Sequence, residues 1–345
     1  MTRQIMVGSV AIGGGAPISI QSMLNTKTTD VEGSLEQIRK LKTAGCQIVR
    51  LAVPNMEAAH AFGAICKESP LPLVADIHFD YKLAISAAEG GAAKIRINPG
   101  NIGGEDRVKA VVDVCRDRKI PIRIGVNGGS LDKRLLEKYG HPTAEALVES
   151  AFEHIALLEK FDFYDTCVSM KSSTVPTMVA ASRLFREKCD YPLHIGVTET
   201  GPVRMGLIKS AMGIGALLLD GIGDTLRVSL TDDPVEEVYA AKDILKAAGL
   251  REEGVNIISC PTCGRTQIDL IGLVNRVDAA LKDCKKPITV AVMGCVVNGP
   301  GEAREADIGI AGGDGVGLLF EKGQQVAKLP YDQLLDALLE RIESF

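Results

Sequence analysis

Three cysteines near the C-terminal end of the chain have the type and spacing of metal ligands. Cys260 and Cys263 form a Cys-x-x-Cys pair, and Cys295 follows farther along the chain. An iron–sulfur cluster is commonly held by four cysteine thiolates, so this set is one thiolate short. Glu302 ends the glycine-rich segment Asn298-Gly-Pro-Gly-Glu302, shortly after Cys295. If Glu302 is the fourth ligand, the cluster has one hard, exchangeable ligand and can bind substrate as well as store electrons.

Zinc and a redox dithiol are the alternative uses of the Cys-x-x-Cys pair. A zinc ribbon requires a second close pair, whereas Cys284 and Cys295 are eleven positions apart and Cys284 ends a predicted helix. A thioredoxin-type dithiol opens a helix in a βαβ unit and would not recruit Cys295. The pair alone is a weak signal. Together with Cys295 and the segment up to Glu302, it favours an iron–sulfur site.

Cationic side chains recur in and after short apolar runs in the first two thirds of the chain. Burying a guanidinium costs several kcal/mol unless a counterion accompanies it, so these cations require anions. Ion pairs with Asp76, Glu199 and other nearby acids would explain any one of them. The whole set outnumbers those acids and predicts an anionic ligand, and arginine forks suit phosphate oxygens. The set comprises Arg50, Arg96, Arg123 and Arg227 within the runs, His78 and Lys171 after them, and the donors of Asn127-Gly128-Gly129-Ser130.

One carboxylate among these cations suits proton transfer. Glu199 lies just after the seventh predicted strand and is the best candidate for a general acid in this part of the chain. His78, taken alone, is more typical of a hydrogen-bonded loop histidine than of a catalyst. The residues therefore predict an anion-binding mouth with an acid at its edge.

The elements that must position these groups repeat one rhythm of apolar strand, polar loop and amphipathic helix. Eight such repeats within about 245 residues predict a (β/α)8 TIM barrel, whose functional groups lie at the carboxyl ends of its strands. An open doubly wound sheet is the alternative, but no Gly-x-Gly-x-x-Gly follows the first strand. The predicted strands are Ile18–Met23, Gln47–Val53, Leu73–Asp76, Ala93–Ile97, Ile122–Val126, Asp165–Met170, Leu193–Thr198 and Thr225–Leu230.

A change of rhythm after the predicted helix Asp233–Ala248 indicates a second domain. We predict a substrate-binding barrel over residues 1–249 and a small α+β iron–sulfur domain over residues 250–345. The second domain is predicted to contain strands Val255–Ser259, Pro287–Met293, Ala306–Ala311 and Gly315–Phe320, and helices Thr266–Cys284 and Tyr331–Ile342.

Composition and charge narrow the classes of partner. The formal net charge is −5 and no basic block is present, so nucleic acid is not expected. No apolar run has the length that crossing a bilayer requires, so no membrane partner is expected. Nine cysteines, an odd number scattered without a secretory signal, predict a cytoplasmic protein rather than a disulfide framework. Polar Gln4 and Ser9 and the following glycine run predict a strand and turn at the start rather than a signal peptide.

The cysteine and arginine motifs together resemble a known enzyme family. They are Cys260-Pro-Thr-Cys263-Gly-Arg-Thr, Met293-Gly-Cys-Val-Val-Asn-Gly-Pro-Gly-Glu302, Ala75-Asp-Ile-His-Phe and Arg96-Ile-Asn-Pro-Gly. They are similar to those of the 4-hydroxy-3-methylbut-2-enyl diphosphate synthases, iron–sulfur enzymes of the methylerythritol phosphate route to isoprenoids. The resemblance extends from the N-terminal strand to the last helix, in the two-domain bacterial form.

The resemblance implies a reaction, a cofactor and a set of site residues. The substrate would be 2-C-methyl-D-erythritol 2,4-cyclodiphosphate, whose ring is opened and dehydroxylated with two electrons from flavodoxin or ferredoxin. Glu199 would supply protons, and Asn298 would lie near the reacting carbons. Cys260, Cys263, Cys295 and Glu302 would hold a 4Fe-4S cluster, while Arg50, His78, Arg96, Arg123, Asn127, Lys171, Arg227 and Ser229 would hold the diphosphate.

The connection between the two domains predicts a homodimer. The eighth helix returns the chain to the amino ends of the strands, away from the predicted site. A strand of about eight residues spans ~26 Å, which the short linker from Leu250 to Gly254 covers only when nearly fully extended. We therefore predict a head-to-tail homodimer in which the cluster domain of one subunit completes the barrel site of the other. The family resemblance implies the same arrangement.

Two other functions fit parts of this pattern. A non-redox 4Fe-4S hydro-lyase would use the exchangeable iron as a Lewis acid on a phosphorylated substrate. A phosphosugar-binding barrel would carry a C-terminal domain that is only a zinc-stabilised interaction module. The reductive synthase is the main prediction.

Overall fold

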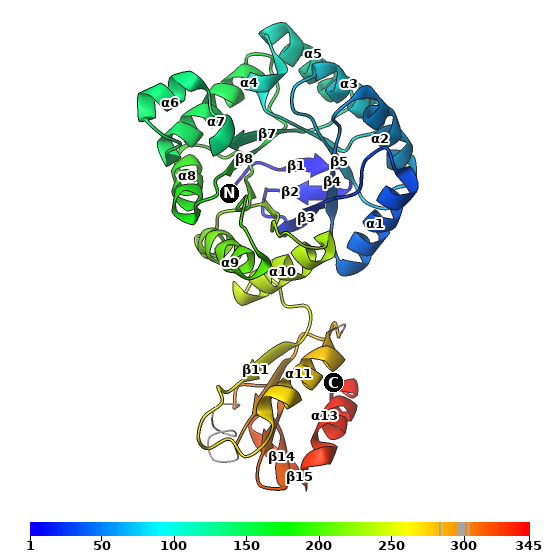
Figure 1. The fold of residues 1–345 in the computed structure, drawn as a ribbon, viewed down its shortest axis with the longest axis vertical. Coiled ribbons are helices and arrows are strands. Elements are labelled where there is room, and N and C mark those ends of the chain that lie inside the picture. The colour runs from blue at the N-terminus through cyan, green and yellow to red at the C-terminus, as the bar shows by residue number, and fades with distance from the viewer. Residues whose placement is uncertain (283, 296–300, 302–303) are drawn as a thin grey trace. The chain divides into compact units, whose positions relative to one another are not determined.

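The computed structural model describes residues 1–282, 284–295, 301 and 304–345. The chain divides into two compact units, Met1–Leu250 and Arg251–Phe345 (Figure 1). None of the helices that the structure describes is long and apolar enough to cross a membrane.

The first unit is a barrel of eight parallel strands, in the order β8-β7-β6-β5-β4-β3-β10-β9. A bridge between Val168 and Leu193 joins the two ends of this order and closes the barrel. The predicted TIM-barrel fold is therefore confirmed. The strands are β3 (Ser19–Met23), β4 (Ile48–Ala52), β5 (Leu73–Asp76), β6 (Lys94–Ile97), β7 (Ile122–Asn127), β8 (Thr166–Lys171), β9 (His194–Ile195) and β10 (Thr225–Leu226).

Helices surround the strands of the barrel (Figure 1). Helix α1 illustrates how the sequence defines them: the Asp30 carboxylate accepts the amide of Gly33 at its start, and Gly45 adopts a left-handed conformation at its end. The helices are α1 (Val31–Ala44), α2 (Met56–Glu68), α3 (Tyr81–Glu89), α4 (Pro99–Ile102), α5 (Glu105–Asp117), α6 (Lys133–Tyr139), α7 (Ala144–Glu159), α8 (Val175–Lys188), α9 (Val203–Leu219) and α10 (Pro234–Ala247).

A short hairpin closes the amino-terminal end of the barrel. Strands β1 (Ile5–Val7) and β2 (Val10–Ile12) pair antiparallel and cross the centre of the barrel in Figure 1. Their buried side chains form an apolar cluster with Ile48, Val74 and Cys167 from three barrel strands. This floor leaves the carboxyl ends of the strands as the side at which polar groups gather.

Strands β9 and β10 have two residues each and are much shorter than predicted. A Cβ atom at Gly196 would lie 2.3 Å from the carbonyl oxygen of Arg227, so the backbones approach too closely there for a regular ladder of larger residues. Beyond this point Thr198 donates its amide to Ser172, and Thr200 donates its hydroxyl to the carbonyl of Ser229. Both segments therefore leave the sheet and form loops above it.

The second unit contains a mixed five-stranded sheet with helices α11 (Leu270–Leu281) and α13 (Leu334–Glu343). Side chains of both helices pack with those of the sheet around Val290, Ile308 and Ile310. The strands in sheet order are β11 (Asn256–Ser259), β12 (Thr289–Met293), β13 (Ile308–Gly312), β14 (Val316–Glu321) and β15 (Gln324–Pro330).

Two predictions for this unit were wrong. Strand β15 was missed because it is a largely exposed edge strand with little apolar alternation in its sequence. Helix α11 begins at Leu270 rather than Thr266, because the Asp269 carboxylate accepts the amide of Gly272 and caps the helix there.

Candidate functional site

A cavity of about 120 Å³ lies at the carboxyl ends of the barrel strands and contains most of the predicted substrate-binding residues. Five of its lining side chains are lysine or arginine, and one is a carboxylate. The structure therefore brings together cations from five separate strands or loops. The cavity is lined by Arg50, Asp76, His78, Arg96, Arg123, Asn127, Ser169, Lys171, Thr198 and Arg227.

The register of the parallel strands aligns these groups. Asp76 pairs with Arg96 across β5 and β6, and Arg96 pairs with Arg123 across β6 and β7. Asn127 pairs with Lys171 across β7 and β8. Alternate residues of a strand point to the same face of the sheet. Cations at matching positions of neighbouring strands therefore lie side by side on the inside of the barrel.

A glycine on β7 makes room for one of these cations. A Cβ atom at Gly125 would lie 2.4 Å from Nε of Arg96. The Arg96 guanidinium therefore occupies the space that any other residue at position 125 would fill. This requirement was not visible in the sequence.

Asp76 holds two of the arginines. Its Oδ1 accepts Nη1 of Arg96 at 3.0 Å, and its Oδ2 lies 3.7 Å from Nε of Arg50. Burial acts to raise the pKa of Asp76, but the two guanidinium groups outweigh it and hold that pKa below its ordinary value. Burial in turn lowers the pKa of Arg50 to about 10. The sequence reading of Asp76 as a counterion agrees with this geometry.

Glu237 on α10 holds Arg227 and was missed by the sequence reasoning. Its carboxylate accepts Nε of Arg227 at 3.1 Å and Nη2 at 2.8 Å, a bidentate pair. It also accepts the amide of Leu230 and the hydroxyl of Ser22, so its oxygens are well satisfied. The sequence does contain a signal for Glu237, because this carboxylate lies on the same face of α10 as the core residues Val238 and Ala241.

Arg123 and Lys171 supply positive charge that these carboxylates do not neutralise. Arg123 is fully buried, and none of its three guanidinium nitrogens hydrogen-bonds to a residue that the structure describes. Burial and the surrounding guanidinium groups lower the pKa of Lys171 well below its ordinary value. A buried, unpaired guanidinium is unstable by itself, so the cavity is suited to an anion.

Other predicted site residues do not line this cavity. Glu199 is exposed in the loop after β9, with a left-handed φ of 53° that is strained for this residue type. Ser229 is half-buried, and its carbonyl accepts the Thr200 hydroxyl at 2.6 Å. Asn298 and Glu302 lie outside the described residues. Sequence reasoning also missed Ser169 and Thr198, which line the cavity without a motif that marks them.

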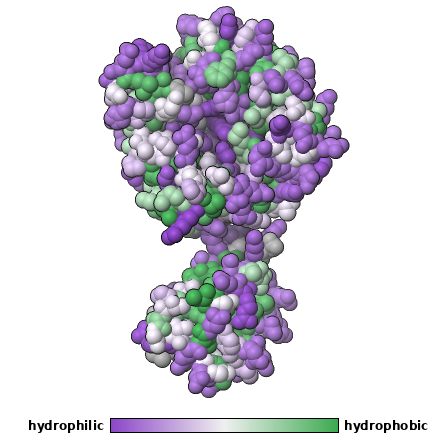
Figure 2. All heavy atoms as spheres, in the orientation of Figure 1, coloured by the Kyte–Doolittle hydropathy of each residue, from purple (hydrophilic) through white to green (hydrophobic). Residues whose placement is uncertain are grey.

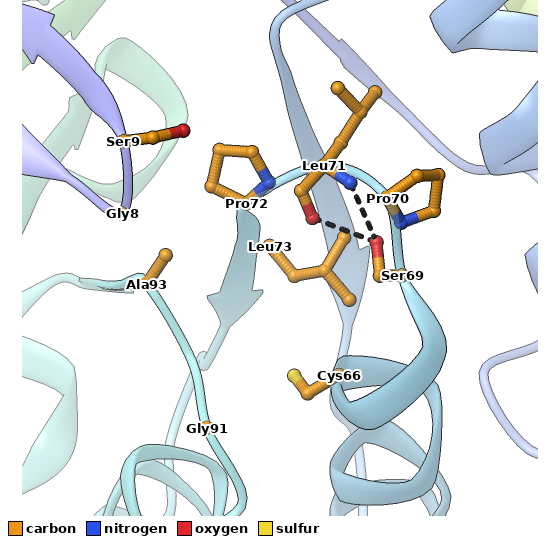
Figure 3. Close-up of a pocket in the computed structure, with 10 residues that line it drawn as sticks. All are labelled: Gly8, Ser9, Cys66, Ser69, Pro70, Leu71, Pro72, Leu73, Gly91 and Ala93. Carbon is orange, nitrogen blue, oxygen red and sulfur yellow. Dashed lines mark hydrogen bonds between the residues drawn. The ribbon is translucent and has the colours of Figure 1, made fainter.

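A larger cavity of about 300 Å³ lies at the opposite end of the barrel, beside the β1–β2 turn (Figure 3). Glycine, proline and alkyl groups form much of its wall, and the Ser69 hydroxyl bonds to the backbone of Leu71. Burial raises the pKa of the Cys66 thiol there to about 12, so this thiol is a poor nucleophile. Size therefore does not identify the functional site, whereas convergent charge does.

The cysteines of the second unit follow neighbouring strands. Cys260 comes directly after β11, and Cys295 comes shortly after β12, which is parallel to β11. The amide of Gly294 donates to Sγ of Cys260 at 3.3 Å. Backbone donors near Arg265 lower the pKa of the Cys263 thiol, which favours the thiolate that binds metal.

This donor set fits an iron–sulfur cluster but is not assembled into one among the described residues. No group of three or more histidine, cysteine or acidic side chains is close enough to hold a metal ion in residues 1–282, 284–295, 301 and 304–345. Thiolates at one sheet edge and an amide donated to sulfur are nevertheless features of iron–sulfur sites. The fourth predicted ligand, Glu302, falls outside that part of the chain.

The closed parallel barrel and its cavity define a TIM-barrel protein whose strand ends surround a cation-lined cavity of a charge that suits a small anion. Models of the GcpE TIM-barrel domain and the GcpE protein C-terminal domain match residues 2–242 and 256–344. Relatives from Geobacter sulfurreducens (59% identity over 342 residues) and Clostridium perfringens (58% over 343) are both named 4-hydroxy-3-methylbut-2-en-1-yl diphosphate synthase (flavodoxin). The alignments cover 99% of this chain and 97% and 98% of those relatives. The chain therefore belongs to the GcpE family of 4-hydroxy-3-methylbut-2-en-1-yl diphosphate synthases, and the resemblance of its motifs is confirmed.

Solved structures support the barrel fold independently. Dihydropteroate synthase from Stenotrophomonas maltophilia is similar with a TM-score of 0.53 and 13% identity, over 71% of this chain and 97% of that one. Phospho-2-dehydro-3-deoxyheptonate aldolase from Thermotoga maritima has a TM-score of 0.52 and 14% identity, over 72% of each chain. At such low identity the likeness concerns the fold alone.

Proposed function

We propose that this protein converts 2-C-methyl-D-erythritol 2,4-cyclodiphosphate into 4-hydroxy-3-methylbut-2-enyl diphosphate, a reductive step of isoprenoid biosynthesis by the methylerythritol phosphate pathway. The observation that carries the proposal is Arg123, which is buried without a hydrogen-bond partner among the described residues, in a cavity whose lining includes five cations and one carboxylate. The names of its full-length relatives support the same reaction, and no observation favours the hydro-lyase alternative.

The cavity binds the diphosphate through two kinds of cation. Asp76 and Glu237 hold the guanidinium groups of Arg50, Arg96 and Arg227 in place before substrate arrives, which reduces the entropy lost on binding. Arg123 and Lys171 provide the charge that the substrate neutralises. His78, Asn127 and Ser229 complete the proposed contacts with phosphate oxygens.

The second unit is proposed to hold a 4Fe-4S cluster through Cys260, Cys263, Cys295 and Glu302. When bound, the cluster supplies the two electrons of the reaction one at a time. The amide that Gly294 donates to Cys260 stabilises negative charge on that sulfur. Asn298 is proposed to contact the reacting carbons.

Glu199 is proposed to donate the proton that the reaction consumes. It lies in the loop after β9, one residue from Thr198, which lines the cavity. Its exposure gives it access to protons from solvent.

Flavodoxin is the proposed electron donor, because the relatives' names include it. Ferredoxin is the alternative electron donor for the same reaction. A cytoplasmic location is proposed on the basis of the unpaired cysteines among the described residues.

A homodimer is proposed, with an active site shared between subunits. Helix α9 has an exposed apolar stripe of Met205, Ile208, Met212 and Leu219, whereas the face of the barrel unit drawn in Figure 2 is mostly hydrophilic. A second copy of the chain is the proposed partner of this stripe. Met212→Asp should shift the protein toward monomers in sedimentation, and an unchanged dimer would exclude the stripe as the interface.

Anaerobic assay of the purified protein tests the reaction. With reduced flavodoxin, the cyclodiphosphate should be converted to the open-chain diphosphate, and without a donor no turnover should occur. Turnover without any reductant would instead support the hydro-lyase. A colourless protein that contains zinc would exclude the iron–sulfur mechanism.

A further inference from the structure

A second layer of polar side chains lies inside the barrel, below the anion cavity. Lys94 precedes Arg96 by two residues on β6 and therefore faces the same side of the sheet. Cys167 pairs with Arg123 across β7 and β8, and His194 is the first residue of β9. All of these side chains are buried. The apolar floor formed with the β1–β2 hairpin includes Cys167, so this layer lies between the floor and the cavity.

Among the described residues, no carboxylate hydrogen-bonds to Lys94 or His194, while the Asp224 carboxylate acts on Cys167. Nζ of Lys94 and both ring nitrogens of His194 lack a hydrogen-bond partner there. Among the described residues, the guanidinium groups of Arg123 and Arg50 disfavour positive charge on Lys94, and the Cys167 side chain lies near it. His194 experiences the same guanidinium groups, together with Lys171 and Lys94.

This environment disfavours positive charge on the inner layer. Burial, with the neighbouring guanidinium groups, lowers the pKa of Lys94 to about 7 and that of His194 well below its ordinary value. Burial also raises the pKa of Cys167, which stays a neutral thiol. An anion in the cavity above would offset much of the positive charge of the guanidinium groups, and the amine would then favour its charged form more strongly.

We propose that Lys94 is a proton acceptor coupled to substrate binding: its buried amine, which has no hydrogen-bond partner among the described residues, is only partly charged in the unliganded protein and takes up a proton from solvent when a dianion occupies the cavity. The ammonium then adds a positive charge beneath the phosphates without contacting them. The proton comes from solvent, and no other bond forms or breaks. The inference rests on the proposed function, because it requires an anionic substrate in this cavity.

Calorimetric titration with the cyclodiphosphate in buffers of different ionisation enthalpy measures the protons taken up. This ligand is a suitable probe because its two phosphate groups keep constant charge near neutral pH. We expect uptake by the wild type to increase as the pH rises above about 7, where unliganded Lys94 is mostly neutral. Lys94→Met should lose this uptake, whereas Lys67→Met, the same change at an exposed position of α2, should retain it.

Three results would overturn the inference. Binding by the wild type without proton uptake would refute it and leave the proposed function intact. Full proton uptake by Lys94→Met would show that another group, such as Lys171, binds the proton. Absence of any binding by the wild type would refute the proposed function as well.

The pH dependence of folding stability, measured without ligand, tests separately whether the pKa of Lys94 is lowered in the folded protein. Lys94 binds a proton in the unfolded chain up to its ordinary pKa of 10.5, but in the folded protein only up to about 7. Between these values the unfolded state binds more protons, so the stability of the wild type rises with pH. Lys94→Met should therefore be more stable than the wild type below about pH 7, with an advantage that shrinks as pH rises toward 10. An advantage that does not change with pH would contradict a depressed pKa.

Discussion

The cation-lined cavity of the barrel and the loops that carry Cys260 and Cys295 in the second unit differ in how they position their functional groups. In the barrel, register between parallel strands places cations from separate strands around one cavity before any ligand arrives. In the second unit the cysteines lie in loops after β11 and β12, and the described residues do not form a closed ligand set. Groups on strands are preorganised by the backbone ladder, whereas groups on loops are positioned by the metal that they bind.

The largest expected effect comes from removing one cysteine. Cys295→Ser should abolish turnover, because a cluster with one fewer thiolate is not retained. Binding of inorganic diphosphate to the barrel should change by less than about twofold, since every residue that lines the cavity belongs to the first unit. Iron content, activity and calorimetric titration check this. A large loss of diphosphate binding would show that the two sites do not form independently.

Arg123→Met should give the next largest loss of activity, through a change that is confined to the barrel unit. Loss of a buried charge that pairs with substrate typically costs about 2–5 kcal/mol, so kcat/KM should fall at least ~30-fold. The unliganded variant should be as stable as the wild type or more stable, because Arg123 has no hydrogen-bond partner among the described residues. Thermal unfolding and kinetics measure both. Strong destabilisation would mean that Arg123 is a structural residue.

Glu237→Gln tests whether the Arg227 guanidinium must be positioned before substrate binds. The variant keeps the shape but loses the charge that holds Arg227, so we expect kcat/KM to fall about tenfold, mainly through KM. Glu236→Gln, on the exposed face of the same helix, is the matched control and should leave both constants unchanged. Equal effects of the two variants would exclude a positioning role.

The smallest effect concerns acid stability. The pKa of Asp76 is held below its ordinary value of 3.8, so its contribution to stability is complete above that value and lost as pH falls through the lower folded-state pKa. Asp76→Asn should be less stable than the wild type at neutral pH, and the difference should shrink below about pH 4. Urea unfolding at several pH values measures this. A difference that persists in acid would show that charge is not the cause.

Much of the barrel was predictable because each strand carries its own signal. Apolar runs interrupted by arginine marked Arg50, Arg96, Arg123 and Arg227, and the barrel rule placed them at one mouth. The short β9 and β10 were not predictable, because their sequences remain apolar after the ladder ends at Gly196. Strand β15 was missed for the opposite reason, since an exposed edge strand needs no apolar face.

The sequence by itself determined which residues can do chemistry, the repeating architecture that carries them and the family to which the chain belongs. Types and spacings are local properties, so cysteine pairs and arginines in apolar runs are readable directly. Only the tertiary structure decided which charges are neutralised. Glu237 reaches Arg227 from the last barrel helix, Gly125 admits the Arg96 side chain, and Arg123 and Lys94 lack counterions among the described residues. Charge balance depends on distances between segments far apart in the chain, which no local pattern records.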